Sequence, residues 1–93
     1  MSEFRIFETA EFQKKLGKLP AGAYPFVQKK LTDYAYPQLR KDPFLGPNIK
    51  KLKGYDPATW RYRIAKFRVF FMVDQAERVI FLLSVDDRRD AYR

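Results

Sequence analysis

Residues 60–85, WRYRIAKFRVFFMVDQAERVIFLLSV, carry the pattern that is most informative about the fold. Apolar side chains recur at every second position in two runs between residues 60 and 74, which is the period of half-buried β-strands. Residues 75–78 supply a turn, and residues 79–85 are nearly all apolar, as in a central strand covered on both faces. The stretch therefore predicts three consecutive strands joined by short turns.

The segment before these strands predicts one strand and two helices. Residues 3–7 alternate apolar with charged side chains, which is typical of a first strand. Thr9 is a suitable cap for a first helix that ends at Pro20, and Pro25 suits the first turn of a second helix that ends at Pro37. The apolar side chains of both helices recur at intervals of three and four residues: Phe12, Leu16 and Leu19 in the first, and Val27, Leu31 and Tyr34 in the second. The two helices are expected to form a hairpin.

Residues 37–59 contain repeated prolines and glycines and are predicted to form a loop that Leu45, Ile49 and Leu52 attach to the core. A loop of this length is a candidate functional segment. The order of elements predicts one α+β domain over residues 1–93. It consists of an N-terminal strand, a helical hairpin and then an antiparallel sheet with the helices packed on one face.

The composition excludes several kinds of chemistry. The 93 residues include no cysteine, which removes disulfides and thiolate sites, and no histidine, the commonest general base and metal ligand. The sequence has no Gly-rich phosphate loop and no serine elbow. The N-terminus lacks an apolar signal core, and no run approaches the ~18 apolar residues of a membrane span, so we expect a cytoplasmic protein without membrane contact.

The charge predicts an anionic partner. Nineteen Lys and Arg against eleven Asp and Glu give a net charge of +8. RNA, DNA, anionic lipid and an acidic protein all fit such a charge. Most of the excess lies in residues 50–68, which hold seven Lys and Arg and one acid, Asp56.

Three arginines are the leading candidates for a functional site. Because alternate residues of a strand share a face, Arg61 and Arg63 are expected to project opposite the core, and Arg68 on the next strand joins them. Residues from the loop and the C-terminus are expected to complete the group: Lys53, Arg88 and Tyr92. Guanidinium groups hold phosphate oxygens bidentately and stabilise the added charge of a pentacovalent transition state. The alternative interpretation is a solvated basic sheet face.

The residues alone do not identify the group that accepts the proton. Arginine remains protonated, so the base is Tyr92, a lysine, an aspartate such as Asp87, or no group on the protein. Asp86 and Asp87 also fit a turn or an arginine partner. A second basic group, in the loop, either binds RNA or is only solvated: Lys50, Lys51 and Lys53.

Short motifs in a fixed order resemble the RelE/ParE superfamily of bacterial and archaeal toxins. They are the loop KKLKG at 50–54, the strand pair WRYRI at 60–64 and FRVFFMVD at 67–74, and the final strand LSV at 83–85 followed by Arg88 and Tyr92. The resemblance covers nearly the whole chain. It implies a RelE-like microbial ribonuclease-type fold.

The resemblance also implies the toxin of a type II toxin-antitoxin system, held inactive by a cognate antitoxin protein. The RelE branch enters the ribosomal A site and cleaves mRNA there, by attack of the ribose 2′-hydroxyl on the neighbouring phosphate, with no metal and no small-molecule cofactor. The ParE branch uses the same scaffold as a non-enzymatic inhibitor of DNA gyrase. An inactive relative that only binds its antitoxin is the third reading.

Phosphate-handling roles follow from the same resemblance. Arg61 and Arg63 fall where RelE carries two lysines, and together with Lys53 they are expected to position RNA and phosphate. Arg68 falls on the arginine that stabilises transition-state charge. Arg88 matches the C-terminal arginine and is expected to act at the leaving 5′-oxygen or its phosphate.

Proton transfer is the remaining role that the resemblance implies. Tyr92 matches the C-terminal tyrosine of the family and is the leading candidate. Asp87 stands where many relatives carry a histidine and is the second candidate.

Overall fold

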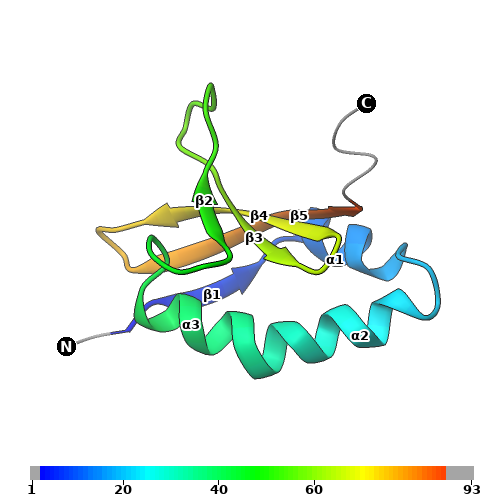
Figure 1. Cartoon of the computed structure of the whole chain (residues 1–93). Coiled ribbons are helices and arrows are strands. Elements are labelled where there is room, and N and C mark those ends of the chain that lie inside the picture. The colour runs from blue at the N-terminus through cyan, green and yellow to red at the C-terminus, as the bar shows by residue number, and fades with distance from the viewer. Residues whose placement is uncertain (1–2, 88–93) are drawn as a thin grey trace.

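The computed structural model of the chain describes residues 3–87, which form an α+β fold (Figure 1). Its five-stranded sheet has the order β1-β5-β4-β3-β2. The strands are β1 (Arg5–Glu8), β2 (Ile49–Lys51), β3 (Trp60–Ile64), β4 (Phe67–Asp74) and β5 (Val79–Asp87). The helices are α1 (Ala10–Gly17), α2 (Ala23–Lys30) and α3 (Tyr36–Lys41), with a π-helical turn, η1 (Leu31–Ala35), between the last two. Among the described residues, no helix is long and apolar enough to cross a membrane.

Helix α1 forms where the sequence predicts it and is held to the sheet through its cap. The Thr9 hydroxyl accepts a hydrogen bond from the Phe12 N–H at 3.1 Å and donates one to the Leu82 carbonyl oxygen of β5 at 2.6 Å. Phe12 and Leu16 are buried on the inner side of the helix. One side chain therefore both starts α1 and joins it to the central strand.

The second helix does not end at Pro37, so that prediction was wrong. The helix continues through Pro37 to Lys41, because Pro37 lies in the first turn of α3, where a missing N–H is tolerated. In η1 the N–H of Tyr36 bonds to the carbonyl oxygen of Leu31, five residues back. This wider turn carries the chain into α3 without a break (Figure 1).

The buried face of this long helix also differs from the expected one. Its buried side chains recur every four residues: Val27, Leu31, Ala35 and Leu39. Tyr34, which the sequence pattern placed on the apolar face, is 60% exposed. The four-residue spacing continues through the π-helical turn, so the whole helical segment has one continuous buried face.

The predicted loop at 37–59 was wrong in two places. Its first residues belong to α3, and residues 49–51 form the short strand β2, which pairs antiparallel with β3. Ile49 packs against the core as predicted, whereas Leu45 is 73% exposed and its neighbours Pro43 and Phe44 are the inward residues instead. Strand β2 depends on its pairing with β3, a contact between distant residues that local composition does not encode.

The three C-terminal strands form as predicted, but the sheet is not wholly antiparallel. Strand β1 pairs parallel with β5, with Ile6 opposite Ile80, while all other pairs are antiparallel. The helices carry the chain from β1 at one edge of the sheet to β2 at the other. The predicted first strand at residues 3–7 is displaced slightly, to 5–8.

The two faces of the sheet have different roles. The core face carries the buried side chains against which the helices pack: Tyr62, Ile64, Phe67, Val69, Phe71, Ile80, Leu82 and Val85. Figure 1 shows the long helix below this face and the loop after β2 projecting above the sheet. As predicted, the helices lie on one face, so alternate residues of β3 and β4 project from the helix-free face.

Candidate nucleic-acid interface

The strand register brings the predicted arginines together on the helix-free face. Arg63 of β3 lies directly opposite Arg68 of β4, and Arg61 lies opposite Phe70. Side chains directly opposite in an antiparallel pair share a face, with Cβ atoms about 4.5–5.5 Å apart. Arg61, Arg63 and Arg68 therefore form one group, which we call the arginine face.

Strand β2 extends this face with one lysine and turns another away. Lys50 lies opposite Arg61 and thus shares the arginine face, whereas Lys51 lies opposite Trp60 on the other side. The Lys51 ammonium lies 5.9 Å from the centre of the Trp60 ring. Lys53 is exposed in the projecting loop. The three loop lysines that the sequence grouped therefore point in different directions.

The three arginines differ in their surroundings. The Arg61 guanidinium is half-buried and donates from Nη1 to the Asn48 carbonyl oxygen at 2.8 Å, an oxygen that also accepts from the backbone N–H of Arg63 at 2.9 Å. The Arg68 guanidinium carbon lies 5.4 Å from the centre of the Phe70 ring. The Arg63 side chain is exposed. Arg61 therefore helps to hold the start of β2, and Arg63 is the most accessible of the three.

The two aspartates at the end of β5 lie on opposite faces. Asp86 lies opposite Arg68, so it belongs to the arginine face, and its Oδ1 lies 3.7 Å from Nζ of Lys15. Asp87 lies opposite Phe67 on the core face, and its Oδ2 lies 3.3 Å from Nζ of Lys66. Asp87, the second candidate for proton transfer after Tyr92, thus lies on the face opposite the arginines, whereas Asp86 lies on their face.

The alternation pattern of the sequence could have indicated the face of the sheet on which Asp86 lies. Val85 ends an apolar strand and is expected to be buried, so strand alternation assigns the next residue to the helix-free face. The sequence pattern predicts that the strand ends at Val85 with both aspartates beyond it, whereas β5 continues to Asp87. Two further predicted site residues, Arg88 and Tyr92, lie outside the described residues.

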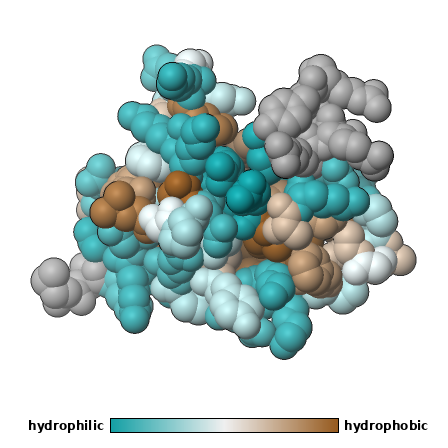
Figure 2. Space-filling view, in the orientation of Figure 1, coloured by the Kyte–Doolittle hydropathy of each residue, from teal (hydrophilic) through white to brown (hydrophobic). Residues whose placement is uncertain are grey.

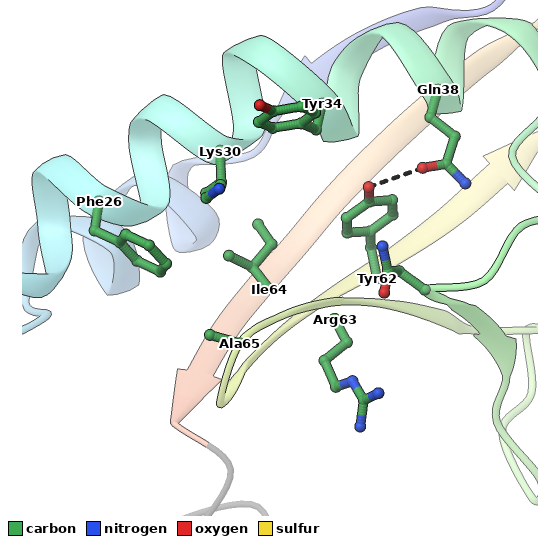
Figure 3. A pocket seen from close by; sticks show the side chains of 9 residues that line it. Phe26, Lys30, Tyr34, Gln38, Tyr62, Arg63, Ile64 and Ala65 are labelled. Atoms are coloured by element: carbon green, nitrogen blue, oxygen red, sulfur yellow. Dashed lines mark hydrogen bonds between the residues drawn. The ribbon is translucent and has the colours of Figure 1, made fainter.

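A groove that Arg63 of the arginine face also lines was not predicted. It has a volume of about 530 Å³ and lies between the long helix and the end of β3 (Figure 3). At its base the Tyr62 hydroxyl donates to Gln38 Oε1 at 2.8 Å. Phe26 and Tyr34 line it from the helix and are 41% and 60% exposed. The groove was missed because the sequence pattern assigned Tyr34 to the buried face of the helix, and Phe26 was not considered.

The visible surface of the molecule is mainly hydrophilic, with smaller apolar areas (Figure 2). In Figure 2, hydrophilic residues cover the projecting loop and much of the visible face, with apolar patches between them. Among residues 3–87 there is no group of three or more His, Cys, Asp or Glu side chains that could hold a metal ion. The chemical groups that the described arginine face offers are guanidinium, ammonium and one carboxylate.

The fold defined by these elements is that of the RelE toxins. The chain is similar to a chain of the toxin-antitoxin complex RelBE2 from Mycobacterium tuberculosis, with a TM-score of 0.72, 23% identity, and coverage of 92% of this chain and 99% of that one. It is also similar to a mutant of the Escherichia coli toxin RelE in the free state, with a TM-score of 0.66, 21% identity, and coverage of 99% and 90%.

A third similar structure is the RelB-RelE antitoxin-toxin complex from Methanococcus jannaschii, with a TM-score of 0.64, 21% identity, and coverage of 92% of this chain and 94% of that one. No protein-family profile and no curated protein sequence matches the chain. The relationship is therefore one of fold, and it confirms the RelE-like architecture expected from the sequence motifs.

Proposed function

We propose that this chain is the toxin of a type II toxin-antitoxin system and a metal-independent endoribonuclease that cleaves mRNA in the ribosomal A site. One observation carries the proposal: Arg63 and Arg68 lie directly opposite each other on a helix-free face, with Arg61 and Lys50 beside them. Like charges opposite each other destabilise a sheet, and an anionic ligand bound between them would relieve this repulsion. The RelE fold supports the choice of RNA.

The proposed reaction uses the ribose 2′-hydroxyl as the nucleophile. Its oxygen attacks the neighbouring phosphorus, the bond to the 5′-oxygen breaks, and a 2′,3′-cyclic phosphate results. Arg61 and Arg63, with Lys53 in the loop, position the phosphates, and Arg68 stabilises the charge that develops on the phosphoryl oxygens. The ring of Phe70 beneath the Arg68 guanidinium restricts its orientation, which favours a preorganised site.

The C-terminal residues complete the proposal. Arg88 acts at the leaving 5′-oxygen or its phosphate, and Tyr92 is the leading candidate for transferring a proton. Lys50 of β2, which shares the arginine face, contacts the RNA backbone, whereas Lys51 lies on the opposite face of β2 and is not part of the proposed interface. We propose that residues 1–93 form one toxin domain, that it acts in the cytoplasm, and that it requires no cofactor.

The proposed partner is a cognate antitoxin protein. Two of the similar structures are complexes of RelE-type and RelB-type proteins. A net charge of +8 favours fast association with an acidic partner. The groove at the end of β3 has exposed aromatic rings for apolar contacts, together with the Lys30 ammonium, which lies 4.9 Å from the centre of the Tyr34 ring.

The test is induction of the chain in a bacterial host without an antitoxin, followed by mapping of the 5′ ends of cellular mRNA. We expect growth arrest and cuts within translated codons, both lost in Arg68→Ala. Arg40→Ala, a change of an exposed arginine on α3, is the matched control and is expected to retain the cuts. Antitoxin binding by Arg68→Ala should survive, which shows that the variant is folded.

Two outcomes would contradict the ribonuclease assignment. Growth arrest with intact message and a DNA damage response would indicate a ParE-like inhibitor of gyrase. An absence of arrest would indicate an inactive relative that only binds its antitoxin. Full toxicity of Arg68→Ala, with cuts still present, would instead remove Arg68 from the catalytic group.

A further inference from the structure

A row of three charged side chains crosses the helix-free face of the sheet. Arg63 of β3 lies opposite Arg68 of β4, and Arg68 lies opposite Asp86 of β5. All three side chains share one face, because directly opposite residues in antiparallel strands do so. The row therefore places one carboxylate next to the guanidinium that is proposed to stabilise the transition state.

Of the described residues in this row, only Asp86 can accept a proton. Guanidinium groups stay protonated and have no acceptor atom, whereas an ionised carboxylate has two acceptor oxygens. Asp87 is one residue away but lies on the core face beside Lys66, with its side chain 19% exposed. Asp86 is 31% exposed, so a ligand on the arginine face can reach its carboxylate.

We propose that Asp86, in place of Tyr92, is the general base of the RNA cleavage, an inference that rests on the proposed function. Its carboxylate takes the proton from the ribose 2′-hydroxyl while the 2′-oxygen forms a bond to phosphorus. The bond from phosphorus to the 5′-oxygen breaks, and the departing 5′-oxygen takes a proton from water. Arg68, opposite Asp86, binds the phosphoryl oxygens, so base and charge stabiliser come from neighbouring strands.

The competing explanation is that Asp86 only joins α1 to the sheet. Its Oδ1 lies 3.7 Å from Nζ of Lys15, and both side chains are partly exposed. Ion pairs of this kind contribute little to stability, so the contact does not account for a carboxylate among arginines. The two explanations differ in what loss of the charge does to catalysis.

The experiment measures single-turnover cleavage of mRNA on programmed ribosomes by the full chain. Asp86→Asn keeps the size of the side chain but cannot accept the proton, and general-base catalysis typically contributes about 10²–10⁴-fold. We expect a fall of at least about 100-fold in the cleavage rate, with ribosome affinity retained. Asp86→Glu restores a carboxylate and is expected to recover part of the rate.

Two further variants serve as comparisons. Asp33→Asn removes a carboxylate that is paired with Lys29 at 2.9 Å on the long helix, and it is the matched control expected to cleave at the wild-type rate. Lys15→Met removes the ion pair but leaves the Asp86 carboxylate. A rate within a few-fold of wild type in Lys15→Met supports a catalytic role over a merely structural one.

Several results would overturn the inference. The first is cleavage by Asp86→Asn at the wild-type rate. The second is an equal loss of ribosome affinity and cleavage rate in Asp86→Asn. The third is a loss of cleavage rate in Asp87→Asn but not in Asp86→Asn. In each case the wild-type chain still cleaves and the proposed function stands. A wild-type chain that cuts no message overturns the proposed function, and this inference with it.

Discussion

Arg63 and Arg68 lie directly opposite each other on β3 and β4, so the sheet places two side chains of like charge on the same face as neighbours. A pair of this kind costs stability, since like charges directly opposite repel at a Cβ separation of about 5 Å. Asp86, opposite Arg68 on the far side, offsets part of this repulsion. The sheet thus tolerates an unfavourable pair in a position where a phosphodiester anion between the two side chains would offset their repulsion.

The first prediction is that Arg63→Gln raises stability and weakens RNA binding. Removal of one charge relieves the repulsion, so the free energy of unfolding in urea should rise by about 0.2–1 kcal/mol. RNA affinity should fall, and the slope of log affinity against log salt concentration should decrease by about 1. The control is Arg5→Gln, an exposed arginine on the same face opposite Val79, which should leave stability nearly unchanged. Lower stability in Arg63→Gln would show that the repulsion is not significant.

The second prediction concerns two glycines. A Cβ at Gly46 would overlap the side-chain amide of Gln38, whose Oε1 accepts from the Tyr62 hydroxyl, so Gly46→Ala should disrupt that hydrogen bond. We expect a loss of about 1–3 kcal/mol in the free energy of unfolding, as for other overpacked sites. Gly17, at the end of α1, has no atom within 4 Å of such a Cβ. Gly17→Ala should therefore be neutral or stabilising by up to about 1 kcal/mol. Equal effects of the two changes would contradict the steric explanation.

The third prediction is a loss of stability at high pH that depends on Tyr36. Burial, and the hydrogen bond that its hydroxyl donates to Glu8 Oε2 at 2.5 Å, raise the pKa of Tyr36 above its ordinary value. A raised pKa in the folded state means that stability is complete below about pH 10 and falls above it, because only the unfolded chain releases the proton readily.

Urea unfolding measured between pH 8 and about pH 11 tests this. One retained proton gives a decline of at most about 1.4 kcal/mol per pH unit, and Tyr36→Phe should make the observed decline shallower. Tyr34→Phe, a change of an exposed tyrosine, should leave the slope as in the wild type. An unchanged slope in Tyr36→Phe would exclude Tyr36 as the source.

The fourth prediction is that Thr9→Ala destabilises the fold. The change removes the acceptor for the Phe12 N–H and the donor to the Leu82 carbonyl oxygen. Loss of a helix cap costs about 0.5–2 kcal/mol, and the second hydrogen bond places the expected value in the upper part of that range. Thr32→Ala, at an exposed position in η1, should change the free energy of unfolding by less than about 0.5 kcal/mol. Thermal or urea unfolding of both variants is the measurement.

The elements with a strong local period were predictable from the sequence. Strands β3, β4 and β5 and helix α1 follow from alternation, from the helical spacing of Phe12 and Leu16 and from the Thr9 cap. The continuation past Pro37 was not predictable, because it depends on the π-helical turn. The short strand β2 was also missed, since its lysines have no strand preference and only the pairing with β3 orders them.

The candidate site was likewise predicted in part from the sequence. Alternation along β3 correctly placed Arg61 and Arg63 on one face, and the register then placed Arg68 beside them. The sequence grouped Lys50 with Lys51 and favoured Asp87, whereas the pairing separates the lysines and moves Asp86 to the arginines. A one-residue difference reverses the face of a strand residue, so a site on a sheet cannot be assigned until the ends of its strands are known.

The basic charge, the absence of cysteine and histidine and the α+β order of elements can be recognised from the sequence alone. Local periods and composition are properties of neighbouring residues, and they need no tertiary contact to be recognised. Only the tertiary structure decided that β1 runs parallel to β5, that Arg63 faces Arg68, and that Asp86 completes their row. These relationships join residues that are distant along the chain or depend on exact strand registration, which the packing of the core against the helices sets.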